Sequence, residues 1–271
     1  HKHVRSEKDI FSIEALMRNN IIGAIKLMKL CSLNPPSYFF SVSTDKATNP
    51  VNIMGASKTL MEKIILSKKK IFRVATARFA NVAFSNGSLL QGFEYRLEKN
   101  QPLSCPSDIK RFFVSPKQSG QICFLSTFLG ESGCIFFPKL NFDKDQIYFK
   151  KISQDFLKFN GFEPEIVSSE DEAKKFEIIK YPKKYPIYYF NSDTSGEKKY
   201  EEFYSDEENY NLNKFKSLGF IKSEEISLSL NDLEKDLNKL FKIKNLNKLK
   251  IIDFFNKYIN NFNHIETGKN L

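Results

Sequence analysis

The sequence predicts an α/β protein: the carboxyl-terminal half of a doubly wound parallel sheet, followed by a mixed α/β region. Between residues 12 and 79 of the 271-residue chain, helix-like and strand-like patterns alternate, which is typical of parallel sheets with helical crossovers. A glycine-rich G-x-G-x-x-G turn, which opens the first half of dinucleotide-binding sheets, is not found before or within this alternation. We therefore expect this chain to hold the second half of such a sheet.

The first elements follow from hydrophobic periodicity. Residues 12–30 place apolar side chains at helical spacing, and Ser12 is the expected N-cap. Residues 38–43 (YFFSVS) have the aromatic, β-favouring composition of a buried strand. The elements expected next are a helix over 54–67 and a strand over 71–79. This order is that of a Rossmann-type sheet.

Beyond residue 85 the pattern is less regular. The elements expected there are helices over 88–98, 117–130, 151–160 and 169–180, a strand over 134–138, a mainly loop segment over 181–213 and a helical region over 231–262. We divide the chain into residues 1–100, the carboxyl-terminal half of the Rossmann domain, and residues 101–271, a substrate-binding region with a helical extension.

Composition excludes several classes of protein. With 41% hydrophobic and 27% charged residues, the chain is typical of globular proteins. It contains neither a secretory signal nor an apolar run of the roughly 18–20 residues that span a membrane, so we expect a cytoplasmic protein. The four cysteines form no CxxC pair and there are three histidines, so we expect reduced thiols and no metal site.

The positive charge is concentrated in the first part of the chain. Residues 1–150 hold 22 Lys and Arg against 11 Asp and Glu, whereas residues 151–271 hold 20 against 21. An anionic ligand such as a dinucleotide or a nucleotide-sugar diphosphate fits this asymmetry. Nucleic acid is not expected as a partner, because no helix-turn-helix, zinc-finger or RNP signature is present.

The candidate reaction centre lies where the strand over 38–43 ends. Thr44, Asp45 and Lys46 follow directly, and ligands of open α/β sheets bind at the carboxyl ends of strands. Adjacent Asp and Lys can act as an acid/base pair, although an ion pair on a surface turn is the alternative interpretation. In the following helix, Met54 and Lys58 are four residues apart and share a face.

These residues belong to a longer string, STDKATNPVNIMGASKTLME at 43–62, that resembles the active-site signature of the nucleotide-sugar 4,6-dehydratases. This family of extended short-chain dehydrogenase/reductases acts in polysaccharide and flagellin-glycan biosynthesis. Strings that resemble other family segments, in the same order, are KHVRSEKDIFSIEALMRNNIIGA at 2–24, ARFANVAFSNGSLL at 77–90, SDIKRFFVSPKQSG at 107–120 and SGEKKYEE at 195–202.

The resemblance implies a reaction that uses NAD or NADP: oxidation of the sugar at C4, elimination of water across C5–C6, and return of the hydride to C6. It assigns the C5 base to Lys46, the acid for the C6 hydroxyl to Asp45, and a hydrogen bond to the C4 oxygen to Thr44. For the cofactor it implies Lys58 at the nicotinamide ribose, with Ser43 and His3 nearby. For the nucleotide sugar it implies Arg78, Asn81, Arg111, Glu197 and Lys198.

Met54 departs from the superfamily pattern, which usually has Tyr at this position. A thioether cannot carry a proton. Because a branch of the dehydratases resembles this chain in having Met, the departure does not imply inactivity. The C4 hydroxyl proton must then pass to Asp45, Lys46 or a water, and the sequence does not decide among them.

Two other functions are compatible with the sequence. A 4-epimerase or reductase of the same scaffold shares Lys58 but does not need the Asp45–Lys46 pair, and an inactive truncated remnant is the third hypothesis. For the dehydratase we expect UDP- or GDP-linked N-acetylglucosamine as substrate and a homo-oligomer. Since the chain begins with His1, we also expect it to be a fragment that alone binds NAD(P) poorly and is inactive.

Overall fold

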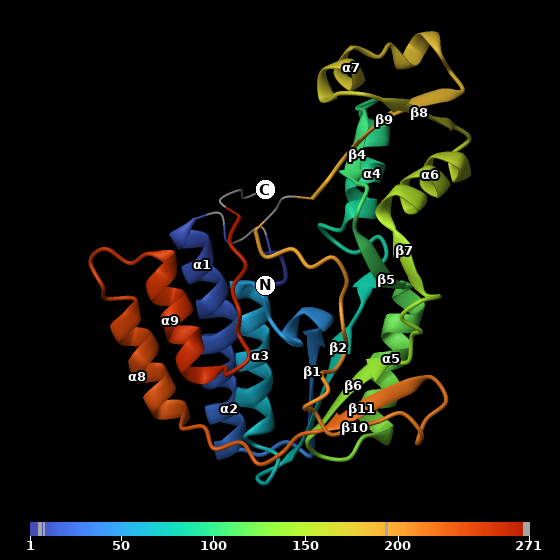
Figure 1. Ribbon diagram of the computed structural model, residues 1–271. Coiled ribbons are helices and arrows are strands. Elements are labelled where there is room, and N and C mark those ends of the chain that lie inside the picture. The colour runs from blue at the N-terminus through green and yellow to red at the C-terminus, as the bar shows by residue number, and fades with distance from the viewer. Residues whose placement is uncertain (5–6, 8, 193–194, 268–271) are drawn as a thin grey trace.

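The central feature of the computed structural model, which describes residues 1–4, 7, 9–192 and 195–267, is a five-stranded sheet (Figure 1). In spatial order its strands are β1 (Tyr38–Thr44), β2 (Arg73–Phe79), β6 (Cys134–Pro138), β11 (Leu218–Lys222) and β10 (Tyr210–Asn211). β1, β2 and β6 are parallel, whereas β11 and β10 are antiparallel to their neighbours. The predicted α/β class with a parallel Rossmann-type sheet is confirmed.

β1 is the edge strand of this sheet. Its register with β2 runs from Tyr38 opposite Arg73 to Thr44 opposite Phe79. Among the described residues β2 is its one strand neighbour, and the Val42 side chain is 50% exposed. The expectation of a buried strand over 38–43 is therefore wrong for most of its residues, because an apolar composition does not reveal whether a strand has neighbours on both sides.

Helices cover both faces of the sheet (Figure 1). On one side, α3 (Ile53–Leu66) contacts β1 and β2. α1 (Ile10–Met17) and α2 (Gly23–Leu33) lie beside α3, and α8 (Leu230–Leu240) and α9 (Lys248–Tyr258) form a layer farther from the sheet. On the other side lies α5 (Pro116–Leu129), which contacts β1, β2 and β6. The helical region expected over 231–262 contains two helices, α8 and α9.

The helix expected over 12–30 begins earlier than predicted. α1 and α2 are continuous through a π-helical turn over Arg18–Ile22. Asp9, not Ser12, is the N-cap, and its carboxylate accepts a hydrogen bond of 2.9 Å from the Ser12 backbone N–H. An N-cap side chain bonds the N–H two or three residues onward, so the polar residue at 12 is the recipient and not the cap.

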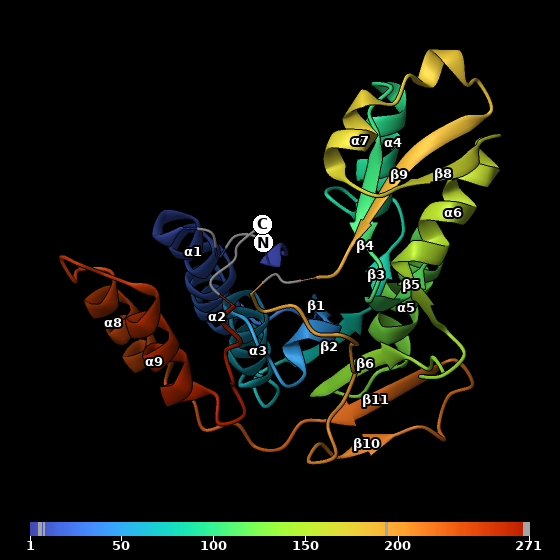
Figure 2. The same cartoon turned by 45° about the horizontal axis from the view of Figure 1, so that its top comes forward.

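A smaller lobe, set apart from the main sheet in Figure 2, has a parallel sheet and a core of its own. Its strands are β4 (Leu103–Pro106), β9 (Lys184–Phe190) and β8 (Glu163–Val167), and its helices are α4 (Leu89–Glu98), α6 (Phe149–Phe159) and α7 (Glu170–Lys175). A 3₁₀ turn over Ile178–Lys180 follows α7, so the helix expected over 169–180 is shorter than predicted. The segment expected to be mainly loop over 181–213 is so for most of its described residues, but its first part forms the central strand β9, which was not predicted.

A third small sheet lies between the main sheet and this lobe. Its strands are β3 (Asn81–Val82), β5 (Lys110–Val114) and β7 (Gln146–Tyr148). The main sheet itself takes β6, β10 and β11 from beyond residue 100. The main sheet thus contains strands from both sides of the predicted domain boundary. The division into residues 1–100 and 101–271 stays a prediction.

Across the described residues, no helix combines the length and the apolar character needed to cross a membrane.

Gly55, in the first turn of α3, allows a test of how closely this helix packs against residue 46. A Cβ at this position would overlap the backbone oxygen of Lys46. We expect Gly55→Ala to lower the free energy of unfolding by about 1–3 kcal/mol, because the backbone must shift to relieve the overlap. Urea unfolding followed by circular dichroism measures this change.

Gly92 in α4 is the matched control, since no atom lies within 4 Å of a Cβ built there. Gly92→Ala should stabilise the protein by about 0.5–1 kcal/mol, because alanine is the better helix former. Equal effects of the two substitutions would contradict the close approach of α3 to residue 46.

Candidate functional site

The candidate site lies at the carboxyl end of β1, in a turn formed by residues 44–47 that we call the strand-end turn. Thr44 is the last residue of β1, and Asp45–Ala47 form a single 3₁₀ turn. α3 packs directly on this turn: Gly55 allows the close approach, and the Thr59 hydroxyl donates a 2.8 Å hydrogen bond to the Ala47 carbonyl oxygen. Strand and helix together hold the turn in place.

Within the turn, one carboxylate oxygen accepts hydrogen bonds from three donors. Asp45 Oδ1 accepts hydrogen bonds from Thr44 Oγ1 at 2.7 Å, from the Lys46 backbone N–H at 2.9 Å and from Lys46 Nζ at 3.2 Å. Asp45 is 1% exposed and the Lys46 side chain 17% exposed. The structure therefore brings the three predicted central residues into one hydrogen-bonded group.

Lys46 is a cation in this environment. Burial lowers the pKa of Lys46, but the negative charges of Asp45 and Glu201 outweigh burial and raise it above the ordinary lysine value. Lys46 Nζ lies 3.3 Å from Glu201 Oε1, so two carboxylates share one ammonium group. At neutral pH Lys46 can donate a hydrogen bond, but it cannot accept a proton until it has lost one.

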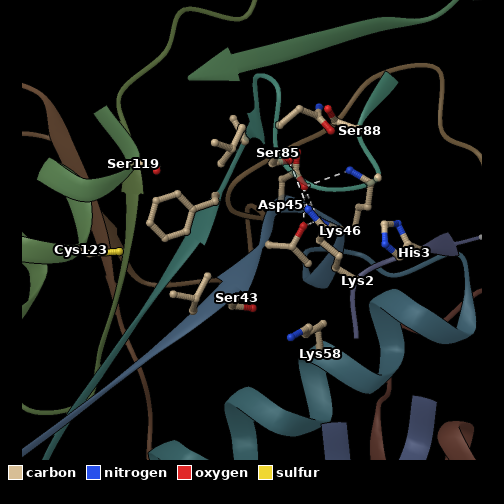
Figure 3. A pocket seen from close by; sticks show the side chains of 17 residues that line it. Lys2, His3, Ser43, Asp45, Lys46, Lys58, Ser85, Ser88, Ser119 and Cys123 are labelled. Carbon is tan, nitrogen blue, oxygen red and sulfur yellow. Dashed lines mark hydrogen bonds and ion pairs between the residues drawn. The ribbon is translucent and has the colours of Figure 1, made fainter. Parts of the chain in front are cut away.

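A cavity of about 410 Å³ opens above the turn (Figure 3). The predicted site residues that line it are His3, Ser43, Thr44, Asp45, Lys46, Lys58 and Asn81. Asn81 also donates a 3.2 Å hydrogen bond to the Phe112 carbonyl oxygen. Met54 is not part of the lining: it is 1% exposed and packs in the main core. Among the described lining residues there is no tyrosine.

Two groups in this cavity suit a ligand that carries hydroxyl groups. The Ser43 hydroxyl is buried and has no hydrogen-bond partner among the described residues. Lys58 Nζ contacts the Met61 sulfur at 3.9 Å, and burial lowers the pKa of Lys58, partly opposed by Glu62. The ribose hydroxyls of a dinucleotide would satisfy both groups, so the residues fit a nicotinamide cofactor.

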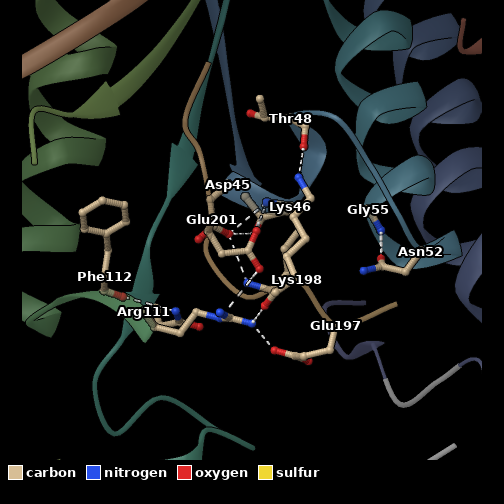
Figure 4. Close-up of polar contacts among 12 residues, drawn as sticks. Asp45, Lys46, Thr48, Asn52, Gly55, Arg111, Phe112, Glu197, Lys198 and Glu201 are labelled. Atoms are coloured by element: carbon tan, nitrogen blue, oxygen red, sulfur yellow. Dashed lines mark hydrogen bonds and ion pairs between the residues drawn. The ribbon is translucent and has the colours of Figure 1, made fainter. Parts of the chain in front are cut away.

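Arg111, Glu197 and Lys198 are also brought together, but not in the wall of that cavity (Figure 4). Arg111, in β5, is 2% exposed, forms an ion pair with Glu197 and donates to the Lys198 carbonyl oxygen at 2.8 Å. Lys198 Nζ donates to the Thr48 carbonyl oxygen at 2.9 Å. These three residues thus fasten residues 195–202, which we call the 195–202 loop, to β5 and to the residue after the strand-end turn.

Glu201 is not among the site residues predicted from the sequence. Its side chain is 2% exposed and reaches both Lys46 and Arg111, whose Nε lies 3.7 Å from Glu201 Oε1. The signal that could have found it is its place in the SGEKKYEE string, four residues after Glu197. Two carboxylates at that spacing in a short loop can reach the same guanidinium.

Arg78 lies elsewhere. It is 3% exposed, pairs with Glu62 of α3 at 2.9 Å and with Glu208 at 2.8 Å, and donates to Thr48 Oγ1 at 3.0 Å. Burial lowers the pKa of Arg78, while Glu62 and Glu208 raise it, with a net increase. It lines a separate cavity of about 330 Å³. With its guanidinium engaged in this way, Arg78 joins β2, α3 and the segment around Glu208.

The model of one protein family, described as polysaccharide biosynthesis protein, matches residues 1–223, most of the chain. The chain belongs to this family.

Several proteins are similar to this chain in sequence, and their names indicate different functions. An uncharacterized membrane protein of Methanocaldococcus jannaschii is 27% identical over 208 residues, which are 74% of this chain and 57% of that protein. The probable polysaccharide biosynthesis protein EpsC of Bacillus subtilis is 34% identical over 123 residues, 44% of this chain and 20% of EpsC. A UDP-glucose 4-epimerase of Rickettsia bellii is 29% identical over 192 residues, 64% of this chain and 55% of the epimerase. The chain therefore spans little more than half of such relatives, or less.

Solved structures agree with the fold. Pen from Bacillus thuringiensis superposes with a TM-score of 0.60 at 20% identity, covering 81% of this chain and 67% of Pen. The dTDP-glucose 4,6-dehydratase DesIV from Streptomyces venezuelae, solved with NAD and DAU bound, gives a TM-score of 0.54 at 14% identity, covering 75% of this chain and 62% of DesIV. At these identities the likeness concerns the fold.

The buried Arg78 ion pairs lead to a prediction about stability. Arg78→Met keeps a long apolar side chain but leaves Glu62, 3% exposed, without its guanidinium partner. We expect the free energy of unfolding to fall by about 3–5 kcal/mol, the usual cost of leaving one buried charge unpaired. Urea unfolding measures it.

The exposed pair Lys70–Glu225, with side chains 71% and 75% exposed, provides the control. Lys70→Met should change the free energy of unfolding by less than about 1 kcal/mol, because solvent screens such pairs. If Arg78→Met proved as mild as Lys70→Met, the structural role assigned to Arg78 would be wrong.

Proposed function

We propose that this protein is a nucleotide-sugar 4,6-dehydratase that uses NAD or NADP and acts on UDP- or GDP-linked N-acetylglucosamine in surface-polysaccharide or glycan biosynthesis. The observation that carries the proposal is the buried Asp45–Lys46 pair in the wall of a cavity at the carboxyl end of a parallel strand. An acid and a base side by side are what an elimination of water requires. Because the chain spans little more than half of its relatives, we propose the activity for the longest form that the gene encodes.

The cofactor would be held in part by Lys58, Ser43 and His3. The first two offer a half-buried amino group and a hydroxyl without a hydrogen-bond partner among the described residues, and all three line the cavity. When bound, NAD or NADP supplies a hydride acceptor for C4 of the sugar and gives the hydride back at C6. The protein's own residues must then move the protons.

The first proton comes from the C4 hydroxyl. Met54 cannot take it, since its side chain is buried in the core and a thioether has no useful basicity. Thr44 Oγ1 already donates to Asp45 Oδ1 at 2.7 Å. A C4 hydroxyl that donates to Thr44 would thus pass its proton through the threonine to Asp45, leaving Asp45 as a neutral acid.

The second step is the elimination. The C4 ketone acidifies the C5 proton, which Lys46 accepts in its neutral form. Asp45 gives its proton to the departing C6 hydroxyl, and water leaves. In the last step Lys46 returns a proton to C5. One positioned acid or base of this kind contributes roughly 10²–10⁴-fold to the rate.

The alternative is a 4-epimerase of the same scaffold, which the names of the Rickettsia relatives support. The cavity favours the dehydratase. An epimerase of this scaffold usually keeps a tyrosine at the position of Met54 and does not need an acid/base pair at Asp45 and Lys46. The described lining contains that pair and lacks a tyrosine. The homo-oligomer and the cytoplasmic location stay predictions.

Mass spectrometry of the products tests the proposal. The protein, loaded with NAD or NADP, is incubated with UDP-N-acetylglucosamine and separately with GDP-N-acetylglucosamine. We expect a product lighter by one water, about 18 Da, from the elimination catalysed by Lys46 and Asp45. An isomer of unchanged mass, separated from the substrate by chromatography, would instead identify the epimerase, and no conversion of either sugar by folded, loaded protein would refute dehydration of these two sugars.

Substitutions within the pair give a second test. Asp45→Asn and Lys46→Met should each lower kcat by roughly 10²–10⁴-fold, because each removes one proton carrier. The exposed substitution Lys70→Met serves as control and should leave kcat unchanged. Wild-type rates in both pair variants would show that the reaction centre lies elsewhere.

A further inference from the structure

The proposed reaction contains a step that the Asp45–Lys46 pair cannot perform alone. Lys46 must be neutral to accept the C5 proton, yet it is an ammonium ion in the resting site. Asp45 cannot take the proton of Lys46, because by then it carries the proton from the C4 hydroxyl. A further acceptor must therefore contact Lys46 Nζ. The inference below rests on the proposed function, since it concerns this step.

Glu201 is the described side chain that meets this requirement. Its Oε1 lies 3.3 Å from Lys46 Nζ, on the ammonium group that also contacts Asp45 (Figure 4). It is 2% exposed, and its other oxygen, Oε2, is buried with no hydrogen-bond partner among the described residues. A carboxylate that lacks donors on one oxygen is poorly stabilised as an anion.

We propose that Glu201 is a positioning residue that takes the proton of Lys46 before the elimination and returns it after the product has formed. It acts through Lys46 and does not touch the sugar. In this arrangement the 195–202 loop supplies a third proton carrier to a reaction centre that the strand-end turn alone leaves incomplete.

The protons balance over one turnover. At the start Asp45 and Glu201 are ionised and Lys46 is charged. The C4 hydroxyl proton passes to Asp45, and the proton of Lys46 passes to Glu201. Lys46 then removes the C5 proton, and Asp45 protonates the leaving hydroxyl, which departs as water. Lys46 returns its proton to C5 as the hydride reaches C6, and Glu201 gives the stored proton back to Lys46.

The surrounding charges suit a carboxyl group that can hold a proton. Burial raises the pKa of Glu201, and the negative charge of Asp45 raises it further. Lys46, Arg111 and Lys198 lower it, but the net shift is upward. These groups come from the strand-end turn, from β5 and from the loop itself. Its raised pKa makes Glu201 a better proton acceptor for Lys46 than a solvated glutamate would be.

A purely structural role explains the geometry less well. Arg111, the other cation near Glu201, is already bound by Glu197 and by the carbonyl oxygens of Lys198 and Lys199. Its Nε is 3.7 Å from Glu201 Oε1, farther than Lys46 Nζ. The closest ionic contact of Glu201 is thus with the proposed base.

The test compares three variants with wild type in single-turnover reactions with the sugar that the wild-type protein dehydrates. In Glu201→Gln the amide can still accept a hydrogen bond from Lys46 but cannot take its proton. We expect the first turnover to form reduced cofactor, while water loss and exchange of the C5 proton with deuterated solvent slow by roughly 10²-fold or more. Water loss should then speed up as the pH rises, because Lys46 must lose its proton to solvent.

Glu201→Asp keeps a carboxylate, so we expect it to retain the wild-type pH profile at a lower rate. It also replaces Glu201→Gln as the deciding variant if the glutamine does not fold. Glu197→Gln is the control. It removes a carboxylate that binds Arg111 but does not contact Lys46, so KM can change while the pH profile of water loss stays the same.

If Glu201→Gln loses water at the wild-type rate and with an unchanged pH profile, the inference is overturned. It is also overturned if the rate of water loss in Glu201→Asp rises with pH, as expected for a variant with no carboxyl group. NMR titration of isotope-labelled lysine gives a readout apart from turnover: Glu201→Gln should lower the pKa of Lys46, because it removes a negative charge. If the wild-type protein forms no dehydrated product, but the pKa of Lys46 falls in Glu201→Gln, the proposed reaction is refuted and the contact between Glu201 and Lys46 stands.

Discussion

The site depends on a chain of buried opposite charges that joins three parts of the fold. Asp45 and Lys46 come from the end of β1, Arg111 from β5, and Glu197 and Glu201 from the 195–202 loop. Each cation lies between carboxylates, so none of the ions is left without compensation in a region of low dielectric. Because carboxylates of the loop pair with cations of the strand end and of β5, the strand end and the loop are held to each other.

The last part of the chain strengthens the same region. Backbone N–H groups of Asn263 and Ile265 donate to the carbonyl oxygens of Pro50 and Val51, and Gly196 donates to Ile265. The family match ends at residue 223, yet this later segment ties the loop before α3 to the 195–202 loop. The geometry around Lys46 is therefore a property of the whole chain and not of the matched family region alone.

Local patterns predicted much of the main sheet and its helices. β1, α3, β2, α5 and β6 lie within a few residues of the expected ranges, because alternation, capping and apolar spacing are properties of short segments. β9 was missed because it lies in a longer segment, 181–213, that is rich in Tyr, Lys, Asp and Asn and is otherwise mainly loop. It is a strand because β4 and β8 pair with it on both sides.

The sequence by itself determined the Rossmann-type order of elements and the place of Thr44, Asp45 and Lys46 at a strand end, since these residues are consecutive and follow directly from β1. It could not show that Met54 is buried in the core, that Arg78 is engaged by Glu62 and Glu208, or that Glu201 contacts Lys46. Only the tertiary structure decided these points. Contacts between residues far apart in the chain depend on how sheets and loops pack, and local sequence patterns do not predict that packing.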